Sequence, residues 1–450
     1  MGKLFGTDGA RGIANLELTC ELAMNIGRAA AIVLTRHAHS KPKVLIGMDT
    51  RVSSRMLEGA LIAGLCSVGA DVLQVGVVPT PAVAYLVKEY KADAGIMISA
   101  SHNPCEYNGI KLFNNQGFKL PDQLEDEIEE LVICKSYGFP MPTGCNIGSV
   151  RYEENAVNKY IESIVSTVDT DLTGLKIALD CANGSASRTA EQLFSKLGAK
   201  CHMLHNKPDG ININDKCGST HMESLIEFVK QNDIDLGLAF DGDADRCLAV
   251  DENGEIVDGD KLIALFALDM KNRGQLKQDT AVVTVMSNIG FTKFADSHGI
   301  KVAVTKVGDR YVLEEMLKND YSIGGEQSGH IIFKDLATTG DGQLTGVQLA
   351  SIMARTKKPL SELASIMKTY PQTCVNIKTT PEGKALLDTD EVITEAIEKV
   401  KARLGNDGRI LVRPSGTEPL IRIMLEGQDL SEIEQLANWV ADVIKERINK

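Results

Sequence analysis

Residues 236–246 have the sequence LGLAFDGDADR, an apolar run that ends in three aspartates at alternate positions, Asp241, Asp243 and Asp245. A short apolar run bounded by turn-forming residues is typical of a buried strand. Carboxylate oxygens are the ligands that hard divalent cations prefer. Three carboxylates so close together would repel one another without a cation. The stretch therefore predicts a strand of an open sheet with a divalent-cation site at its carboxyl end.

The same aspartates also fit part of a calcium-loop pattern. Asp241, Asp243, Asp245 and Glu252 occupy its acidic positions, but Arg246 stands where the pattern requires glycine. The next residues, 247–250, have the pattern of a strand and not of a helix. We therefore reject the calcium loop, and a solvated acidic turn remains the alternative.

Short β-rich runs alternate with helical patterns through much of the chain. The predicted strands are 44–48, 95–98, 176–179, 235–240, 280–286 and 301–304. Strands that alternate with helices indicate parallel α/β sheets, and the loops that follow the carboxyl ends of such strands usually bind ligands.

The carboxy-terminal stretch has a different pattern. We predict strands at 373–378, 409–412 and 420–425, a helix at 381–404, and a last helix that Asp429 can cap. The predicted fold class is α/β, with three related α/β domains with mixed sheets and a C-terminal α+β domain around a central cleft. The predicted domain ranges are 1–150, 151–255, 256–368 and 369–450.

The composition is that of a compact globular protein, with 43% hydrophobic and 24% charged residues. The chain has 48 Lys and Arg against 61 Asp and Glu, a net charge of −13. Such a chain repels a phosphate backbone, so we expect no nucleic-acid partner. An anionic substrate would need a local cluster of cations and backbone N–H groups.

Cysteine usage and hydropathy indicate a cytoplasmic protein. None of the ten cysteines forms a CxxC pair, which is typical of small buried side chains in a reducing compartment. The first residues lack the profile of a signal peptide. The most apolar stretch, 59–87, contains Asp71, Gln74 and two prolines, so we expect no membrane attachment.

Residues 95–104, GIMISASHNP, are an apolar run that enters a polar turn closed by proline. The predicted strand brings the hydroxyl of Ser101 to its carboxyl end. We expect the side chains of Ser101 and His102 to point apart, as in an extended chain, so a hydrolase triad is not predicted. An ordinary Ser/Asn-rich turn is the alternative.

Two further loops carry polar groups. Residues 413–419, RPSGTEP, offer a guanidinium, two hydroxyls and accessible N–H groups, which suit a phosphate dianion. Residues 324–330, GGEQSGH, offer groups that can hydrogen-bond sugar hydroxyls. Each loop alone also fits a plain surface turn.

Together and in this order, the four loops resemble those of the α-D-phosphohexomutase superfamily, and the resemblance covers almost all 450 residues. The resemblance implies that Ser101 carries a phosphoryl group. It implies that Asp241, Asp243 and Asp245 bind one Mg²⁺ per chain, with an oxygen of the Ser101 phosphate completing the metal site.

The resemblance also assigns substrate and catalytic roles. The implied sugar contacts are Glu326 and Ser328, with His330 beside them. The implied contacts to the non-transferred phosphate are Arg413, Ser415, Gly416 and Thr417. Arg11, Lys111 and Arg246 would neutralise phosphoryl charge. His102 and His330 are candidates for proton transfer or for supporting their loops.

The implied reaction is a mutase reaction on a hexose phosphate through a bisphosphate intermediate, with a sugar 1,6-bisphosphate as activator. Gln327 and the compact amino terminus resemble the branch that acts on hexosamine phosphates, and we expect residues 307–310 to contact the sugar as well. Cys105 and Ala10 depart from the residues common in the superfamily, without loss of a functional group. The resemblance further implies a homodimer.

Three alternatives remain at this point. The chain could prefer glucose or mannose phosphates, as other members of the superfamily do. It could be a non-catalytic sugar-phosphate-binding protein, or a serine phosphatase that releases free phosphate.

Overall fold

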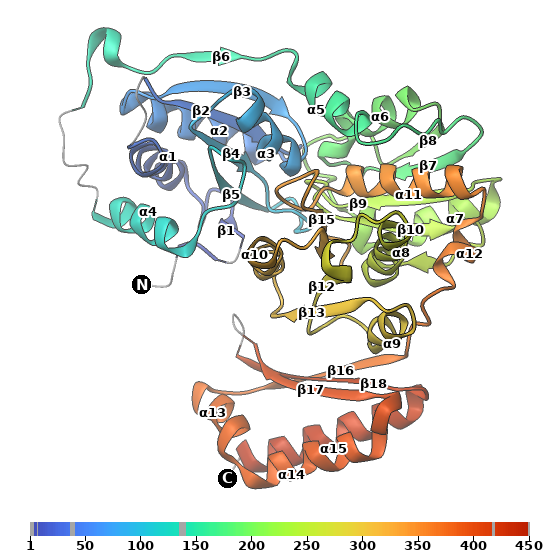
Figure 1. Ribbon diagram of the computed structural model, residues 1–450. Helices are drawn as coiled ribbons and strands as arrows, with labels where there is room; N and C mark the ends of the chain where they lie inside the picture. The colour runs from blue at the N-terminus through green and yellow to red at the C-terminus, as the bar shows by residue number, and fades with distance from the viewer. Residues whose placement is uncertain (1–3, 7, 37–40, 135–140, 416–418, 449–450) are drawn as a thin grey trace. The chain divides into compact units, whose positions relative to one another are not determined.

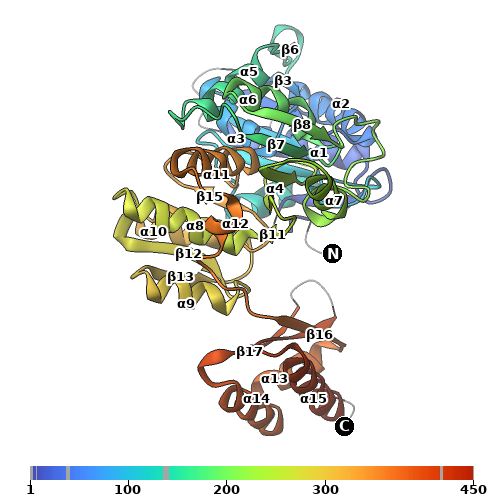
Figure 2. The same ribbon diagram turned by 90° about the vertical axis from the view of Figure 1, so that its right-hand side faces the viewer.

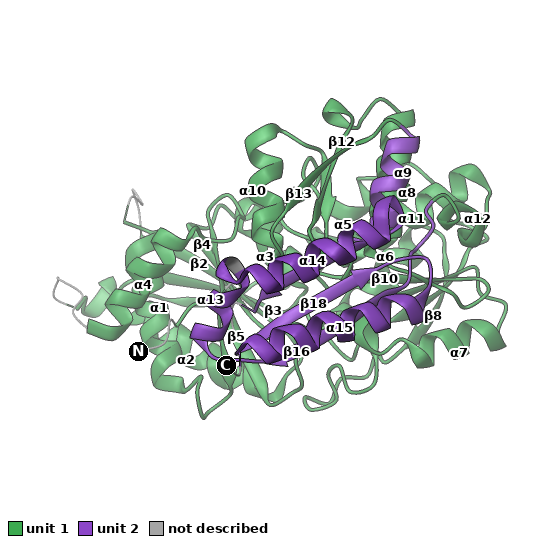
Figure 3. Cartoon of the chain, turned by 90° about the horizontal axis from the view of Figure 1, so that it is seen from below, with its two compact units in different colours: residues 1–286, 299–366 green, residues 287–298, 367–450 purple. Residues whose placement is uncertain are grey.

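The computed structural model describes residues 4–6, 8–36, 41–134, 141–415 and 419–448 (Figures 1 and 2). Their contacts divide the chain into two compact units, shown in Figure 3. Unit 1 comprises residues 1–286 and 299–366, and unit 2 comprises residues 287–298 and 367–450. No helix in the described ranges is long and apolar enough to cross a membrane.

The first sheet of unit 1 is mixed and has the strand order β1-β5-β4-β2-β3-β6. Its strands are β1 (Ala10–Ile13), β2 (Lys43–Met48), β3 (Asp71–Val77), β4 (Ala94–Ile98), β5 (Tyr107–Asn114) and β6 (Val150–Tyr152). β4, β2, β3 and β6 run parallel, and β5 is antiparallel to both β4 and β1.

Helices cover both faces of this sheet. One face shares an apolar core with α1 (Cys20–Leu34), α2 (Val52–Ser67) and α4 (Asp122–Cys134). The other face receives α3 (Thr80–Glu89). Gly47 and Gly95 lie under α3, where an added Cβ would meet valine side chains of this region at 2.6 and 2.4 Å. Glycine at these two positions lets α3 approach the sheet closely, which fixes the position of its amino terminus.

The second sheet has the order β11-β10-β9-β7-β8. Its strands are β7 (Lys176–Asp180), β8 (Lys200–Leu204), β9 (Leu236–Phe240), β10 (Cys247–Asp251) and β11 (Ile256–Val257). The first three run parallel, and β10 and β11 extend the sheet with antiparallel pairing. Its helical neighbours are α5 (Ala156–Val165), α6 (Ala190–Lys196), α7 (Glu223–Gln231) and α11 (Gly342–Thr356).

The third sheet has the order β13-β12-β14-β15, with only β15 antiparallel. Its strands are β12 (Thr280–Thr284), β13 (Lys301–Thr305), β14 (Ile323–Gly325) and β15 (Ile331–Phe333). Two helices, α8 (Gly259–Asn272) and α10 (Asp309–Asn319), pack against it, and the short α12 (Leu360–Ala364) follows α11. All three sheets of unit 1 are mixed, as predicted.

Unit 2 contains an antiparallel sheet of order β16-β18-β17. Its strands are β16 (Gln372–Lys378), β17 (Arg409–Pro414) and β18 (Leu420–Glu426), and its helices are α9 (Ile289–Ser297), α13 (Pro381–Thr389), α14 (Glu391–Leu404) and α15 (Leu430–Ile448). One apolar core joins α14 and α15 to the sheet. The predicted α/β class with a C-terminal α+β domain is confirmed, and the exact domain boundaries stay a prediction.

The prediction of one continuous helix over 381–404 was wrong. The helix breaks at Asp390, whose backbone is extended (φ −86°, ψ 114°). Its carboxylate accepts hydrogen bonds from the N–H groups of Val392 (2.9 Å) and Ile393 (3.2 Å) and so caps α14. The apolar pattern continues across the break, which explains why the sequence indicated one helix.

Replacing Asp390 with alanine removes this cap and the ion pair to Arg447 (2.8 Å). We expect Asp390→Ala to destabilise unit 2 by about 1 kcal/mol, and Asp390→Asn by less because the amide oxygen still caps. Urea unfolding followed by fluorescence tests this, since the single tryptophan, Trp439, lies in α15 of the same unit. Asp442→Ala, at an exposed position of α15, is the matched control. Equal urea midpoints for Asp390→Ala and Asp442→Ala would contradict the prediction.

Candidate active site

The Ser101 hydroxyl lies at the carboxyl end of β4, as predicted. The residue is buried and has a left-handed backbone (φ +52°), which is unusual for a residue with a side chain. Its Oγ donates a hydrogen bond to Oδ2 of Asp241 at 2.5 Å. Its N–H donates to Oγ of Ser99 at 3.0 Å. The serine hydroxyl therefore contacts the aspartate loop that follows β9 in the second sheet.

The expectation that Ser101 and His102 point apart was wrong. The chain turns at Ser101 instead of running extended, so Oγ lies 3.4 Å from Nδ1 of His102. Burial, followed by the charges of Arg246 and Arg11, lowers the pKa of His102 to about 4. His102 is therefore a neutral imidazole near pH 7, able to accept a proton.

The turn that carries Ser101 is held by Arg51, whose guanidinium is fully buried. The guanidinium donates to four backbone carbonyls of the turn, those of Ser101 (3.0 Å), Asn103 (2.7 Å), Pro104 and Tyr107 (3.1 Å). Its Nε pairs with Asp49 at 2.9 Å, and Asp49 also accepts from Ser99 at 2.7 Å. Arg51 and Asp49 were not predicted as functional residues; their place directly after an apolar strand was the available signal.

The three aspartates lie together at the end of β9, and one carboxylate oxygen of each lies within 4.8 Å of the others. All three are buried. Oδ1 of Asp243 and Oδ1 of Asp245 have no hydrogen-bond partner among the described residues. A buried polar atom without a partner is costly, and three carboxylates share this place. The triad therefore fits a metal ion, and its oxygen-only chemistry favours a hard cation.

The surroundings of the triad shift the pKa values of Asp241 and Asp245 in opposite directions. Burial, then Asp245 and Asp243, raises the pKa of Asp241 well above its usual range. Burial also acts to raise the pKa of Asp245, but Lys111, then His330, hold it well below its usual range. A cation bound by the triad would oppose the shift at Asp241 by favouring its charged form.

Lys111 belongs to a closed ring of buried and partly buried ionic groups, which we call the ionic ring. The ring runs in the order Asp245, Lys111, Asp8, Lys119, Asp309, His330 and back to Asp245. Each basic side chain in the ring lies near two of its carboxylates, and Nε2 of His330 also accepts a hydrogen bond from the N–H of Gly340 at 3.1 Å. The ring joins the loop before β1 and the strand β5 to the aspartate loop and to the third sheet.

The links of the ring differ in length. Nζ of Lys111 lies 3.0 Å from Asp8, 2.7 Å from Asp243 and 3.5 Å from Asp245. Nζ of Lys119 lies 2.6 Å from Asp8 and also pairs with Asp309. Burial alone would lower the pKa of Lys111, but Asp243 and Asp8 raise it above its usual value. Lys111 is therefore a permanently charged ammonium beside the metal triad.

The two imidazole contacts of the ring are longer, at 3.7 Å to Asp245 and 3.6 Å to Asp309. Both exceed hydrogen-bond range. Burial acts to lower the pKa of His330, but Asp245 and then Asp309 raise it overall.

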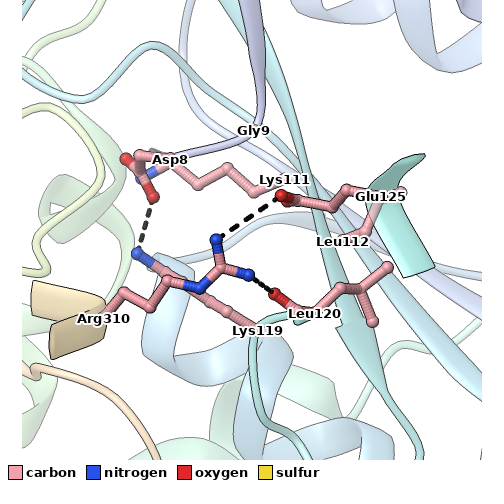
Figure 4. Close-up of a pocket in the computed structure, with 8 residues that line it drawn as sticks. All are labelled: Asp8, Gly9, Lys111, Leu112, Lys119, Leu120, Glu125 and Arg310. Carbon is pink, nitrogen blue, oxygen red and sulfur yellow. Dashed lines mark hydrogen bonds and ion pairs between the residues drawn. The ribbon is translucent and has the colours of Figure 1, made fainter. Parts of the chain in front are cut away.

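A small cavity adjoins the ring (Figure 4). It is lined by Asp8, Lys111, Lys119 and Arg310 among others. Arg310 donates to the carbonyl of Leu120 and to Asp122. The side chains of Asp309 and Arg310 are thus engaged in contacts to residues 119–122, and the expected sugar contact of this loop remains a prediction.

The sugar-loop residues follow β14. Oε1 of Glu326 accepts a hydrogen bond from the N–H of Gly308 at 3.0 Å, which links the loops 307–310 and 324–330. Ser328 is exposed. Nε2 of Gln327 donates to Asp258 at 3.2 Å. Sequence analysis placed these residues on loops correctly, but their roles stay predictions.

The remaining predicted cations differ in their surroundings. Arg11 pairs with Asp8, a member of the ionic ring. The N–H of Arg246 donates to Asp241 at 3.2 Å, and its buried Nε has no hydrogen-bond partner among the described residues. Both cations therefore lie in the neighbourhood of the triad.

In unit 2, Arg413 stands opposite Arg422 in the pairing of β17 with β18. Burial, then the charge of Arg422, lowers the pKa of Arg413. Ser415 is buried, and its carbonyl accepts from Lys384 at 2.6 Å. Two adjacent guanidiniums suit an anion. The predicted contacts Gly416 and Thr417 lie outside the described residues.

Comparison with known proteins agrees with this geometry. Four domain profiles of the phosphoglucomutase/phosphomannomutase family match residues 2–136, 158–254, 258–370 and 375–443. The chain is 56% identical over 449 residues to a phosphoglucosamine mutase of Clostridium novyi and 58% identical to that of Caldanaerobacter subterraneus, with all of each chain covered. A crystal structure of a family protein from Burkholderia thailandensis aligns with TM-score 0.82 at 27% identity, covering 98% of both chains.

Oδ1 of Asp243 has no hydrogen-bond partner among the described residues, so we expect this carboxylate to be needed for stabilisation of the protein by Mg²⁺. Saturating Mg²⁺ should raise the melting temperature of the wild type, because binding at a hundred times Kd stabilises by about 2.7 kcal/mol. Asp243→Asn should lose most of this increment. Differential scanning calorimetry checks this, with the exposed Asp279→Asn as control. An undiminished increment in Asp243→Asn would rule out the triad as the site.

Proposed function

The chain belongs to the phosphoglucomutase/phosphomannomutase family, and we propose that it acts as a phosphoglucosamine mutase, interconverting glucosamine 6-phosphate and glucosamine 1-phosphate. The observation that carries the proposal is the 2.5 Å contact between the Ser101 hydroxyl and Asp241 of the metal triad. Such a hydroxyl, when phosphorylated, would present its phosphate to a cation. The full-length identity to phosphoglucosamine mutases supports the choice of sugar. The product would supply UDP-N-acetylglucosamine synthesis.

The proposed reaction is two phosphoryl transfers in opposite directions. In the first, the bond between phosphorus and Ser101 Oγ breaks, a bond to the free sugar hydroxyl forms, and the proton of that hydroxyl passes to a base. The bisphosphate then turns, and its other phosphate returns to Ser101 with the reverse proton movement. Neutral His102 can accept a proton, and Asp245 and Asp309 raise the pKa of His330, which makes the two histidines the candidates for these steps.

Each charged residue near the triad has a distinct task in this scheme. Mg²⁺ held by the triad and a phosphoserine oxygen would supply charge stabilisation to the transferred group. Lys111, Arg11 and Arg246 place further positive charge beside Ser101, and positioning with electrostatics accounts for most phosphoryl-transfer catalysis. We assign the non-transferred phosphate to Arg413, near the end of β17, and to the residues that follow this strand. A sugar 1,6-bisphosphate would activate the enzyme by phosphorylating Ser101.

Gln327 provides a physical reason for an amino sugar. One N–H of its side-chain amide donates to Asp258, and its carbonyl oxygen can act as an acceptor. An acceptor suits the ammonium of glucosamine better than a hydroxyl, because hydrogen bonds to charged donors are stronger. Within the family, glucose or mannose phosphate is the alternative substrate. The homodimer and the cytoplasmic location remain predictions.

Loss of the hydroxyl should abolish the reaction. We expect Ser101→Ala to lower kcat for glucosamine 6-phosphate by roughly 10³-fold or more, since the nucleophile itself is removed. Conversion to the 1-phosphate is followed with Mg²⁺ and a trace of bisphosphate, with Ser163→Ala as control. Glucose and mannose phosphates are assayed in parallel. Preference for either would shift the assignment within the family, free phosphate would indicate a phosphatase, and binding without turnover would indicate a non-catalytic binding protein.

The ionic ring predicts a positioning role for Asp8. Asp8→Asn removes one of three carboxylates around the Lys111 ammonium, and a small displacement of a catalytic charge costs up to about 100-fold in rate. We expect kcat to fall at least tenfold with little change in KM and with the Mg²⁺-dependent rise in melting temperature retained. Asp122→Asn, at an exposed partner of Arg310, is the control. Equal kcat values for the two variants would refute the role.

A further inference from the structure

A second group of metal-ligating side chains lies in unit 1, outside the proposed catalytic machinery. Asp180 ends β7, His205 directly follows β8, and Cys217 precedes a short 3₁₀ helix at Gly218–Thr220. One ligand atom of each lies within 4.8 Å of the others. Strand ends of one sheet thus bring a carboxylate, an imidazole and a thiol together, and the mutase reaction needs none of them.

The carboxylate of this cluster is already oriented. Asp180 is fully buried, and its two oxygens accept hydrogen bonds from the backbone N–H groups of Ala182 (2.9 Å) and Gly218 (3.0 Å). Each oxygen keeps a second lone pair, which a metal can use. The thiol of Cys217 is buried, with the side-chain amide of Asn183 4.0 Å away. Such outer contacts orient ligands at metal sites.

The imidazole supplies an independent observation. Nδ1 of His205 is buried and lies 3.1 Å from Oδ2 of Asp180, yet in an orientation that gives it no hydrogen-bond partner among the described residues. This contact is an ion pair when the imidazole is protonated. The side chain as a whole is 29% exposed, so solvent can reach the cluster. A metal ion bound here would take Nδ1 as a ligand beside the Asp180 carboxylate.

We propose that Asp180, His205 and Cys217 form a binding site for a borderline-soft divalent metal of the Zn²⁺ class, with a fourth position open to water. Thiolate and imidazole ligands select Zn²⁺ or Co²⁺ over Mg²⁺, whereas the oxygen-only aspartate triad has the opposite preference. The Asp180–His205–Cys217 site would therefore prefer Zn²⁺ or Co²⁺, and the aspartate triad would prefer Mg²⁺.

Metal binding at this site must displace protons from the ligands. Burial, then Asp180 and Asp215, raises the pKa of the Cys217 thiol to about 12. The adjacent Asp180 raises the pKa of His205. The thiol proton, and any proton on the coordinating nitrogen, leave to solvent as the bonds to metal form. Metal affinity consequently falls as the pH falls.

The test uses the full-length, reduced, metal-free protein with saturating Mg²⁺ present to occupy the triad. Titration with Co²⁺ should give a saturable thiolate-to-cobalt absorption at one equivalent, and Zn²⁺ should displace it. Cys217→Ser should lose the absorption, and His205→Asn should weaken binding at least tenfold. Cys374→Ser, in unit 2, is the matched control and should titrate like the wild type.

A stability measurement accompanies the titration, because Cys217→Ser changes a buried position. Zn²⁺ should raise the melting temperature of the wild type with Mg²⁺ present and raise that of His205→Asn less at the same Zn²⁺ concentration. No saturable absorption in the wild type, or an absorption that survives in Cys217→Ser, would overturn the proposal. Mutase activity enters neither measurement, so the outcome is independent of the proposed function.

Discussion

The buried guanidinium of Arg51 is the interaction on which the proposed catalytic arrangement depends. A charged group taken fully out of water is tolerated only when every donor is used. Here the donors go to one carboxylate and to the carbonyls of a single turn. The turn can therefore keep its unusual backbone at Ser101, and the hydroxyl is aimed at Asp241 of another sheet. Asn214 reinforces this by donating to Ser101 O at 2.9 Å and to Asn103 O at 3.0 Å.

Around that fixed hydroxyl, unit 1 concentrates charge of both signs. The triad alone would be strongly repulsive, and Lys111 compensates part of it from the first sheet. Thr80, at the start of α3, adds a donor to Asp243 at 2.5 Å. The close packing of α3 over Gly47 and Gly95 is what brings this donor within reach. The packing of α3 on the first sheet therefore also determines a hydrogen bond to the aspartate triad at the end of the second sheet.

The sequence predicted the local features well and the long-range ones poorly. The strand before the triad and the strand before Ser101 were predicted within a residue or two, because apolar runs bounded by turn residues are local signals. The pairing of Lys119 with Asp309 joins residues 190 positions apart, and no local pattern contains it. The polar turn at Ser101 was predicted, but the contact between Ser101 and His102 was not, because Arg51, which holds the turn, lies 50 residues earlier. The helix break at Asp390 was not predicted, because the helical spacing of apolar residues continues across it.

The closed form of the ionic ring has a consequence for how the protein can change over evolutionary time. In an open row of alternating charges, losing one link cuts the row into fragments. In a closed ring, losing one link leaves a single connected row in which most groups still have a counter-charge on both sides. A substitution nearby that lengthens one contact therefore leaves every charge of the ring with a counter-charge, as at the long 3.6 and 3.7 Å links of His330.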